Sequence, residues 1–552
     1  MKSIVNSKYF FPLFLILLTL INVIQGYSTE LLADEAYYWA YSNNLSWGYF
    51  DHPPMVAIWI SISKLFFSDG ELSVRFFSSI TLTATFYIIW RLVNHPKKRE
   101  FTWLFVLLLI TTSLFNVYGF ITVPDTPLMF FAALFLLGYK KYLEEKSTIS
   151  YAILALGMAG MLYSKYQGIL IIFFVLLSNL KVLKDWKIWV TAVVTVLLFS
   201  THLYWQFEND FPSIKYHLVE RSSKKYRIDF TTNHFLNLIA IIGLTFPIIY
   251  MGFYKRFKVK DQFEKALRFI VLGFAIFFFF SSFKNHVQAQ WVVPISIPLI
   301  LIPFYFLIEH PKFLKAFKIL ASITIVVTIA LRIIIANDGI IPKQFEMHGN
   351  KEWVDRLDKE LGDKTPLFIN SYQNTSTYWF YSGKRPYQIN SWDSRKNQYD
   401  IYSYNMDFNI ENPVLIDFRR KNLRRVTDSV SKKNNGYLFL DSVTGNYSKS
   451  RNLWFEFTDE VITLKKNSVN SIHISHEVID AKLLSNINLE VVITSTDKQR
   501  KIYKARLEEQ KVTFSISTLD NFNPSKIQII GTTLKAVKPI RMSTIGKAKL
   551  EN

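Results

Sequence analysis

The chain has no cysteine among its 552 residues. This absence excludes disulfides, thiolate metal ligands and a cysteine nucleophile, and it leaves the redox compartment open because a cysteine-free chain tolerates either one. A GxxxxGK[ST] phosphate loop and a GxGxxG dinucleotide fingerprint are also missing, so nothing supports a nucleotide-driven enzyme. Neither internal repeats nor low-complexity segments are found. The informative features must therefore lie in hydropathy, charge and local motifs.

Apolar residues are abundant and unevenly distributed. Half of the chain is hydrophobic and 16% is aromatic, and the mean hydropathy of +0.16 is high for a soluble protein of this length. Almost all long apolar runs fall in residues 1–336, whereas residues 337–552 have a soluble composition. The composition predicts a membrane domain followed by a soluble region, with the boundary near Ala336–Asn337.

Eleven segments are apolar and long enough to approach the ~20 residues that a membrane-spanning helix needs. The first resembles a signal peptide, but its run is long and its exit, Val23–Gly26, lacks a small-x-small cleavage site, so we interpret it as an uncleaved span. The segments are roughly 9–26, 71–94, 101–119, 126–143, 149–164, 166–181, 187–204, 233–253, 266–283, 288–308 and 314–336.

The formal net charge of +21 comes largely from short basic clusters between these segments. There is no zinc-finger spacing and no long basic tail, so the charge indicates cytoplasmic loops and anionic lipid rather than nucleic acid. The clusters occupy alternate links between the spans, so they all lie on one side of the membrane, which is the cytoplasmic side. If the count of eleven spans is correct, the N-terminus lies in the cytoplasm and residues 337–552 lie outside. The clusters lie at 1–8, 95–99, 140–146, 181–187, 254–265 and 310–318.

Polar residues gather at the predicted outer ends of the spans, and the span centres are nearly free of charge. A transporter needs polar groups across the membrane centre, so this distribution favours chemistry at the outer boundary. The first outer loop, about residues 27–70, contains Asp34 and Glu35, then Tyr37 and Tyr38, and later Asp51–Pro54. Its aromatic residues are either interfacial anchors or substrate contacts, and its acids are either solvated or functional.

The later outer links add further charged and aromatic residues. Asp125 follows Pro124 at the start of a span, where it either caps the helix or takes part in chemistry. Lys165 stands between two spans, where a lysine either extends its amine to the interface or binds an anion. The fourth loop contains Arg221, and the fifth contains His286 and Trp291. Together these residues place carboxylates and cations on one face of a membrane.

Two first-loop stretches, Asp34–Trp39 and Tyr49–Pro54, resemble the bacterial branch of the dolichyl-phosphate-mannose–protein mannosyltransferase family. The lipid A aminoarabinose transferases are relatives of this family within the C-type glycosyltransferase superfamily. The resemblance covers about residues 1–405. Later stretches that are similar to family signatures are Pro124–Pro127, Leu162–Tyr166, His286–Trp291 and Gln398–Tyr402.

The resemblance implies an inverting transfer of a sugar from a lipid phosphate at the outer face of a bacterial inner membrane. Undecaprenyl phosphate is the implied carrier. Asp34 matches the essential first-loop carboxylate of the family, and Asp51-His52 stands where some relatives carry Glu-Lys.

The chemistry of such a transfer assigns roles to the candidates. A carboxylate takes the proton of the acceptor hydroxyl, and cations stabilise the charge that grows on the phosphate. No spacing requires a metal ion, although a carboxylate pair is compatible with a divalent one. The predicted catalytic residues are Asp34, Glu35 and Asp125; the predicted donor-phosphate ligands are Lys165, Arg221 and His52; and the predicted substrate contacts are Tyr37, Tyr38, Asp51, His286 and Trp291.

These residues do not identify the sugar, and the acceptor is a lipid, a glycan or a protein. Two alternative functions are also compatible with the sequence. A lipid-linked glycan transporter or flippase needs a polar path across the span centres, and a structural scaffold leaves the clustered outer charges unexplained.

The soluble region divides into two predicted domains. Residues 337–453 are expected to form an α/β domain and residues 454–552 a β-sandwich. The β-sandwich either binds glycan, positions the acceptor or acts as a spacer. The expected helices are 350–362 and 419–434. The expected strands are Pro366–Tyr372, Tyr378–Tyr381, Pro413–Phe418, Gly436–Leu440, Leu453–Thr458, Ser471–Ile479, Asn488–Thr494, Val512–Ser517 and Lys526–Ile530.

Overall fold

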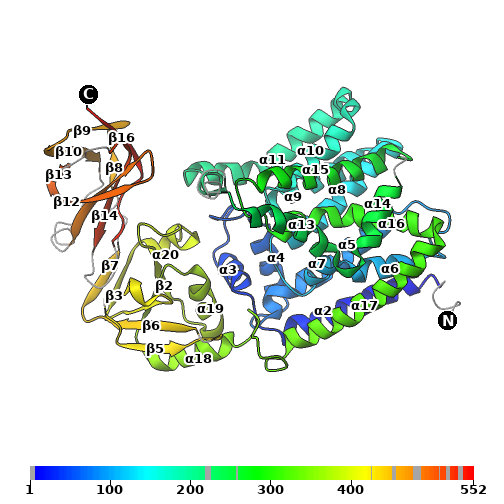
Figure 1. Cartoon of the computed structure of the whole chain (residues 1–552), viewed down its shortest axis with the longest axis horizontal. Coiled ribbons are helices and arrows are strands. Elements are labelled where there is room, and N and C mark those ends of the chain that lie inside the picture. Colours follow the sequence, from blue (N-terminus) through cyan, green and yellow to red (C-terminus); the bar gives the residue numbers. More distant parts are fainter. Residues whose placement is uncertain are drawn as a thin grey trace. The chain divides into compact units, whose positions relative to one another are not determined.

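A computed structural model of the chain divides into two compact units, Met1–His348 and Gly349–Asn552 (Figure 1). The first unit is helical and the second contains all the strands that are described. The residues that the structure describes are 7–217, 226–256, 259–423, 425–434, 436–449, 455–475, 487–508, 510–516, 522–532 and 539–551.

Each of the eleven predicted apolar segments is helical in the structure. Among the described residues, five helices are long and apolar enough to cross a membrane, so the predicted count of about eleven is not confirmed. These five are α2 (Phe10–Ser28), α5 (Leu72–Leu92), α11 (Trp186–Glu208), the continuous stretch of α13 (Ile228–Ile242) and α14 (Phe246–Lys255), and α17 (Pro311–Ala336). The other helices of these segments are α6 (Thr102–Thr111), α7 (Ser113–Val117), α8 (Asp125–Glu145), α9 (Thr148–Ser164), α10 (Gly168–Ser178), α15 (Gln262–Ser281) and α16 (Ser296–Glu309).

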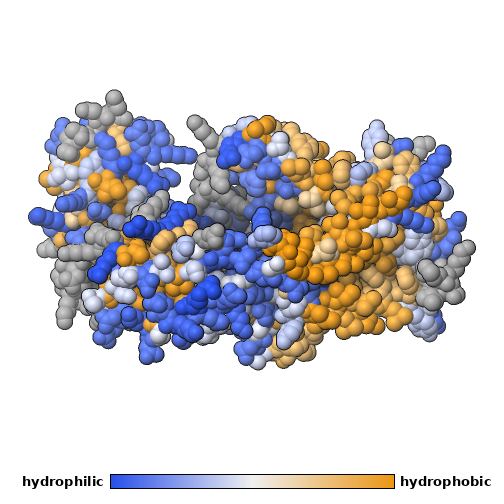
Figure 2. Space-filling model, turned by 60° about the horizontal axis from the view of Figure 1, so that its bottom comes forward, coloured by the Kyte–Doolittle hydropathy of each residue, from blue (hydrophilic) through white to orange (hydrophobic). Residues whose placement is uncertain are grey.

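The surface of the helical unit is apolar. Figure 2 shows hydrophobic side chains gathered in a broad band over this unit, whereas the second unit is largely hydrophilic. Along α17 the apolar side chains of Ile319, Ile323, Ile329, Leu331 and Ile333 are exposed on the surface of the unit. Large exposed apolar areas of this kind are stable against lipid and not against water. The protein is therefore a multi-pass membrane protein.

Close packing of α8 against α9 brings two site residues together. A Cβ on Gly157 of α9 would lie 2.7 Å from the Cα of Phe135 in α8, so the two helix backbones approach through this glycine. Small residues allow such contacts between membrane helices. The helices run antiparallel, which places the start of α8, at Asp125, beside the end of α9, at Ser164.

The long link between α2 and α5 contains two short helices, α3 (Ala33–Ser42) and α4 (Met55–Lys64). We refer to the end of the helical unit that carries these helices as the α3 end. A third short helix, α12 (Pro212–Lys215), follows α11. The remaining short elements of this unit are the 3-10 turns η1 (Leu180–Lys184), η3 (Gly243–Thr245), η4 (Ala289–Trp291) and η5 (Val293–Ile295).

The second unit begins with a mixed five-stranded sheet in the order β2-β1-β4-β6-β5. β1 (Pro366–Ile369) pairs in parallel with β2 (Tyr387–Ile389) and β4 (Val414–Asp417), and β6 (Tyr437–Ser442) pairs antiparallel with β4 and β5 (Asp428–Ser431). The predicted helix over 350–362 is confirmed as α18 (Asn350–Leu361), whose Trp353 and Leu357 enter the core with strand residues.

Two predicted elements of this sheet are wrong. Residues Tyr378–Tyr381 lie in α19 (Tyr372–Ser382), because the Ser371 side chain accepts a hydrogen bond from the Asn374 N–H and starts a helix ahead of the aromatic run. Residues 419–434 form the turn η7 (Arg420–Asn422) and β5 instead of a helix, since Val430 pairs with Leu438 in the sheet. In the first case a local helix cap outweighs the strand propensity of the aromatic residues, and in the second case strand pairing overrides the local helical pattern.

The C-terminal part is rich in β-structure, as predicted, but its strands form one nine-stranded sheet rather than two separate ones. One face of this sheet builds a common core that includes Ile472, Ile493 and Ile527. The sheet contains β8 (Glu456–Phe457), β9 (Val461–Leu464), β10 (Ser468–Ser475), β11 (Asn488–Ser495), β12 (Arg500–Glu508), β13 (Lys511–Ile516), β14 (Pro524–Thr532), β15 (Ile540–Arg541) and β16 (Gly546–Leu550). A two-stranded ribbon of β3 (Phe408–Glu411) and β7 (Asn446–Lys449) and the helix α20 (Ser403–Met406) complete the unit.

Candidate functional site

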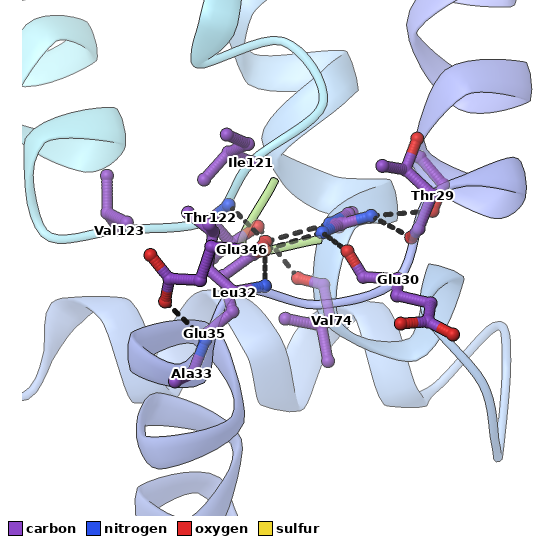
Figure 3. Close-up of polar contacts among 12 residues, drawn as sticks. Thr29, Glu30, Leu32, Ala33, Glu35, Val74, Ile121, Thr122, Val123 and Glu346 are labelled. Carbon is purple, nitrogen blue, oxygen red and sulfur yellow. Dashed lines mark hydrogen bonds and ion pairs between the residues drawn. The ribbon is translucent and has the colours of Figure 1, made fainter. Parts of the chain in front are cut away.

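Glu35 is the centre of a buried polar network at the α3 end (Figure 3). Its side chain is fully buried and pairs with Arg75 of α5, with Nε 2.8 Å from Oε1 and Nη2 2.5 Å from Oε2. Oε2 also accepts from the Leu32 N–H at 3.0 Å, and Oε1 accepts from the Thr122 N–H at 2.9 Å. Each carboxylate oxygen therefore accepts two hydrogen bonds, so the charge is compensated.

Arg75 continues this network toward α2. Its guanidinium donates to the carbonyl oxygens of Gly26, Thr29 and Glu30 at 2.6–3.1 Å. The Glu35–Arg75 pair thus joins the end of α2, the start of α3, α5 and the link before α8. Arg75 is a site residue that the sequence pattern did not predict. Its one signal is an arginine in the first turn of a predicted membrane span.

Asp34 precedes Glu35 in the first turn of α3 and is partly exposed. Neighbouring residues on an α-helix point about 100° apart, because one turn contains 3.6 residues. Asp34 therefore projects from a turn whose backbone Glu35 holds in place. This arrangement separates a fixed, buried carboxylate from an accessible one.

A second buried ion pair joins Asp125 and Lys165. Lys165 Nζ lies 2.8 Å from both oxygens of Asp125, and both side chains are almost completely buried. Asp125 begins α8 and Lys165 follows α9, so the contact closes the helix pair described above. Asp125 comes three residues after Thr122, the residue whose N–H binds Glu35. The two ion pairs are therefore connected through one short link.

Asp51 brings several predicted substrate contacts together. Its Oδ2 accepts from the hydroxyl of Tyr37 at 3.0 Å and lies 3.4 Å from the hydroxyl of Tyr41. The neighbouring His52 has its ring 5.7 Å from the ring of Tyr38, measured between centroids. The structure therefore groups Tyr37, Tyr38, Asp51 and His52 along α3 and the turn that precedes α4.

His202 of α11 ties this group to the end of α9. Its Nδ1 lies 2.7 Å from the carbonyl oxygen of Trp47, so Nδ1 carries the hydrogen, and Nε2 is then the acceptor for the Tyr166 hydroxyl at 3.0 Å. Gln206, one turn later in α11, donates to the Tyr166 hydroxyl at 2.9 Å. His202 has no predicted role in the sequence, where it is one polar residue near the end of a span. Its contacts indicate that it positions the first link beside Lys165.

Replacing Gly48 by alanine should disrupt this junction. The added Cβ would lie 2.3 Å from Trp205 Cε3 and 2.9 Å from His202 Nδ1, and an indole ring packed in a buried site has little room to move. We expect a loss of about 1–3 kcal/mol in the free energy of unfolding, as for other overpacked cores. Thermal unfolding in detergent measures it, and Gly26→Ala is the control, because its Cβ would make only ordinary contacts, 3.5 Å from Arg75 Cβ and 3.8 Å from Leu72 Cδ2. Stability of the Gly48 variant at or above that of the Gly26 variant would contradict the expected clash.

The other predicted site residues lie elsewhere or are not described. His286 and Trp291 follow α15: His286 is exposed, with Nε2 3.2 Å from Asn233 Nδ2 of α13, and the Trp291 ring lies 5.8 Å from that of Phe278. Arg221 falls outside the described residues. Tyr399, in the last family-like stretch, is buried in the second unit and hydrogen-bonded to Ser376 at 2.8 Å.

Within the described part of the chain, no group of three or more histidine, aspartate and glutamate side chains is arranged to hold a metal ion. The side chains that gather at the α3 end are instead two carboxylate–cation pairs and a partly exposed aspartate. This set suits the handling of an anion and a proton.

Residues 51–205 match the dolichyl-phosphate-mannose-protein mannosyltransferase family. Lipid A galacturonosyltransferase RgtD of Rhizobium johnstonii is 23% identical over 198 residues, which cover 34% of this chain and 41% of that protein. The chain thus matches about two fifths of the length of this relative.

Two crystal structures of ArnT from Cupriavidus metallidurans share the fold. The apo structure has a TM-score of 0.57 at 11% identity and covers 78% of this chain and 97% of its own. The structure bound to undecaprenyl phosphate has a TM-score of 0.55 at 12% identity, over 79% and 98%. These findings confirm the predicted resemblance: the chain is similar to the mannosyltransferase family and to ArnT.

Proposed function

We propose that the protein is a membrane glycosyltransferase that moves a sugar from a polyprenyl-phosphate carrier to a lipid, glycan or protein acceptor. The observation that carries the proposal is the α3 end, where a partly exposed Asp34 stands on a turn fixed by the Glu35–Arg75 pair, next to the link that leads to Asp125–Lys165. The similarity to the mannosyltransferase family and to an undecaprenyl-phosphate-bound ArnT supports this donor class.

In this reaction the acceptor hydroxyl oxygen forms a bond to C1 of the sugar. The bond from C1 to the phosphate oxygen breaks, and the polyprenyl phosphate leaves with the electron pair. Asp34 takes the hydroxyl proton in the transition state, since a carboxylate is a suitable general base for a hydroxyl whose acidity rises as the bond forms. Attack from the face opposite the phosphate inverts the configuration at C1.

We propose Lys165 as the first cation that binds the leaving phosphate. An ammonium has three hydrogens, and two of them are directed to the oxygens of Asp125. We propose that the third is directed to a phosphate oxygen of the bound donor, where a preorganised cation stabilises the growing charge. Asp125 accordingly acts through Lys165 by fixing its position. Arg221 and His52 are further proposed phosphate ligands.

Glu35 fits a positioning role better than a catalytic one. It is fully buried, and four donors already occupy its two oxygens. A base must reach the hydroxyl that it deprotonates, and Asp34 is the accessible member of the pair. We propose Tyr37, Tyr38, Asp51, His286 and Trp291 as contacts to the sugar or acceptor.

The proposed setting is the bacterial inner membrane, with the α3 end and the second unit on the outer side. Basic clusters on alternate links support this orientation. The second unit then either presents the acceptor or acts as a spacer. Protease cleavage in intact spheroplasts would detect the second unit only if it lies outside, and protection of that unit would reverse the orientation.

Substituting methionine for Lys165 should weaken donor phosphate binding. It should also destabilise the helical unit, because Asp125 is left buried without its cation, so the kinetics are measured on the folded fraction from size exclusion. We expect about a tenfold rise in KM for the donor, because one charge-assisted hydrogen bond is lost. Lys165→Arg keeps the positive charge, so its KM for the donor should rise less than that of Lys165→Met. Steady-state transfer kinetics at varied donor concentration measure both variants. An unchanged KM in Lys165→Met would remove Lys165 from the phosphate site.

The function itself is tested with the purified protein in detergent micelles, polyprenyl-phosphate sugars and a membrane lipid extract. Sugar transfer to an extract component, detected by mass spectrometry, would support the proposal. Donor flipping across vesicles that contain the protein, without transfer, would favour the transporter instead. If the protein binds polyprenyl phosphate but neither transfers the sugar nor flips the donor, the result would favour a structural scaffold that binds lipid.

A further inference from the structure

The segment after α17 folds back onto the α3 end. We refer to residues 337–348 as the strap. α17 lies beside α2, with the Gln25 amide 3.2 Å from the carbonyl oxygen of Arg332 (Figure 1). The strap therefore starts near the end of α2, which leads into α3.

Two buried residues fix the end of the strap. His348 places Nε2 2.9 Å from the carbonyl oxygen of Ile335 and Nδ1 3.3 Å from Asp338 Oδ1. Met347 packs with Phe120 and Ile121, directly before the Thr122 whose N–H binds Glu35. The strap is thus attached to the same link that the Glu35–Arg75 pair holds.

Glu346 lies next to these two anchors and reaches the first turn of α3. Its Oε1 accepts from the Ala33 N–H at 3.1 Å, as Figure 3 shows. Ala33 is the first residue of α3 and precedes Asp34. The first amides of a helix lack intrahelical acceptors, and a carboxylate there is favoured by both hydrogen bonding and the helix dipole.

The first turn of α3 is consequently held from two directions. The Leu32 N–H is bound by Glu35, a residue of the same helix, and the Ala33 N–H is bound by Glu346, which lies more than 300 residues away in sequence. Asp34 is the next residue. Since the Glu346 side chain is exposed, its contact adds little buried area, and its effect falls mainly on the orientation of this turn.

We infer that Glu346 is a positioning residue for Asp34, so that the strap completes the candidate active site. The inference rests on the proposed function, in which Asp34 is the general base. A base must be held close to its reacting proton, and a displacement of ~1 Å can reduce a rate by about 100-fold. One hydrogen bond to the turn limits the displacement only in part, so we expect a smaller effect than that.

The test compares Glu346→Ala with Glu346→Gln in the full-length protein. Alanine removes the acceptor, and we expect kcat to fall about tenfold with KM for the donor and the melting temperature unchanged. Glutamine keeps an amide oxygen for the Ala33 N–H and should restore most of kcat. Amide hydrogen exchange over α3 should become faster in the alanine variant only. Glu460→Ala, directly before β9 and with its side chain 91% exposed, is the matched control and should match the wild type.

A second variant loosens the strap without touching Glu346. Asp338 accepts a hydrogen bond from Gln344 and contacts His348. Asp338→Ala should therefore lower kcat, as Glu346→Ala does, and make amide hydrogen exchange over α3 faster. Wild-type kcat in Glu346→Ala, or an equal loss in the alanine and glutamine variants, would overturn the inference. If the wild type transfers sugar and Asp34→Asn does not, that result would leave the proposed function in place. A wild type without transfer would instead count against the proposed function itself.

Discussion

Arg75→Met is expected to destabilise the helical unit by about 3–5 kcal/mol, because it leaves the buried Glu35 carboxylate without its cation. Arg75 and Glu35 are both fully buried, so water cannot replace the lost contact. The same substitution removes the donors to the carbonyl oxygens of Gly26, Thr29 and Glu30. We expect a large fall in melting temperature in detergent and lower yield of folded protein, both measured by fluorescence-detected size exclusion.

Two variants separate the ion pair from a general effect of losing an arginine. Arg91→Met removes an arginine at the other end of α5, where Arg91 is exposed and contacts Tyr87 at 3.4 Å, and should change stability by less than about 0.5 kcal/mol. The double variant Arg75→Met, Glu35→Gln removes the charge of Glu35 as well and should recover part of the loss. Equal stability of Arg75→Met and Arg91→Met would show that the buried pair does not hold the α3 end.

The sequence predicted several parts of this site because their signals are local. Asp34, Glu35 and the aromatic residues after them lie in one loop, and Asp125 and Lys165 each follow an apolar segment. Because the spans alternate in direction, the sequence predicts Asp125 and Lys165 on the same face of the membrane. The sequence does not predict that both oxygens of Asp125 lie 2.8 Å from Lys165 Nζ, since that distance depends on the close approach of α8 and α9 at Gly157.

The parts that could not be predicted depend on contacts between distant segments. Arg75 meets Glu35 across 40 residues, and Glu346 meets Ala33 across 313. Nothing in the sequence around Glu346 distinguishes it from a solvated acid in a linker. The aromatic run Tyr378–Tyr381 was mispredicted for a different, local reason, because the cap at Ser371 begins a helix and outweighs the strand propensity of the aromatic residues.

The separation of Glu35 from Asp34 has a direct consequence for the reaction. If Asp34 is the base, Asp34→Asn should reduce kcat by about 10²–10⁴-fold, the usual contribution of general base catalysis. Asparagine has nearly the same size but cannot accept the hydroxyl proton. Since Lys165 and the other phosphate ligands are untouched, binding of polyprenyl phosphate should stay within about twofold of the wild type, as expected for an interaction made only in the transition state.

The measurement is single-turnover sugar transfer, with donor binding followed separately on the same preparations. Asp69→Asn is the matched control, because Asp69 is an exposed aspartate in the link between α4 and α5 and should transfer at the wild-type rate. Full activity of Asp34→Asn would exclude Asp34 as the base and leave Asp51, which accepts a hydrogen bond from Tyr37, as the next carboxylate to test on this link. Lost donor binding in Asp34→Asn would instead place Asp34 in the donor site. A fall in kcat alone, with a folded protein, is the result that the fixed first turn of α3 and the accessible Asp34 predict.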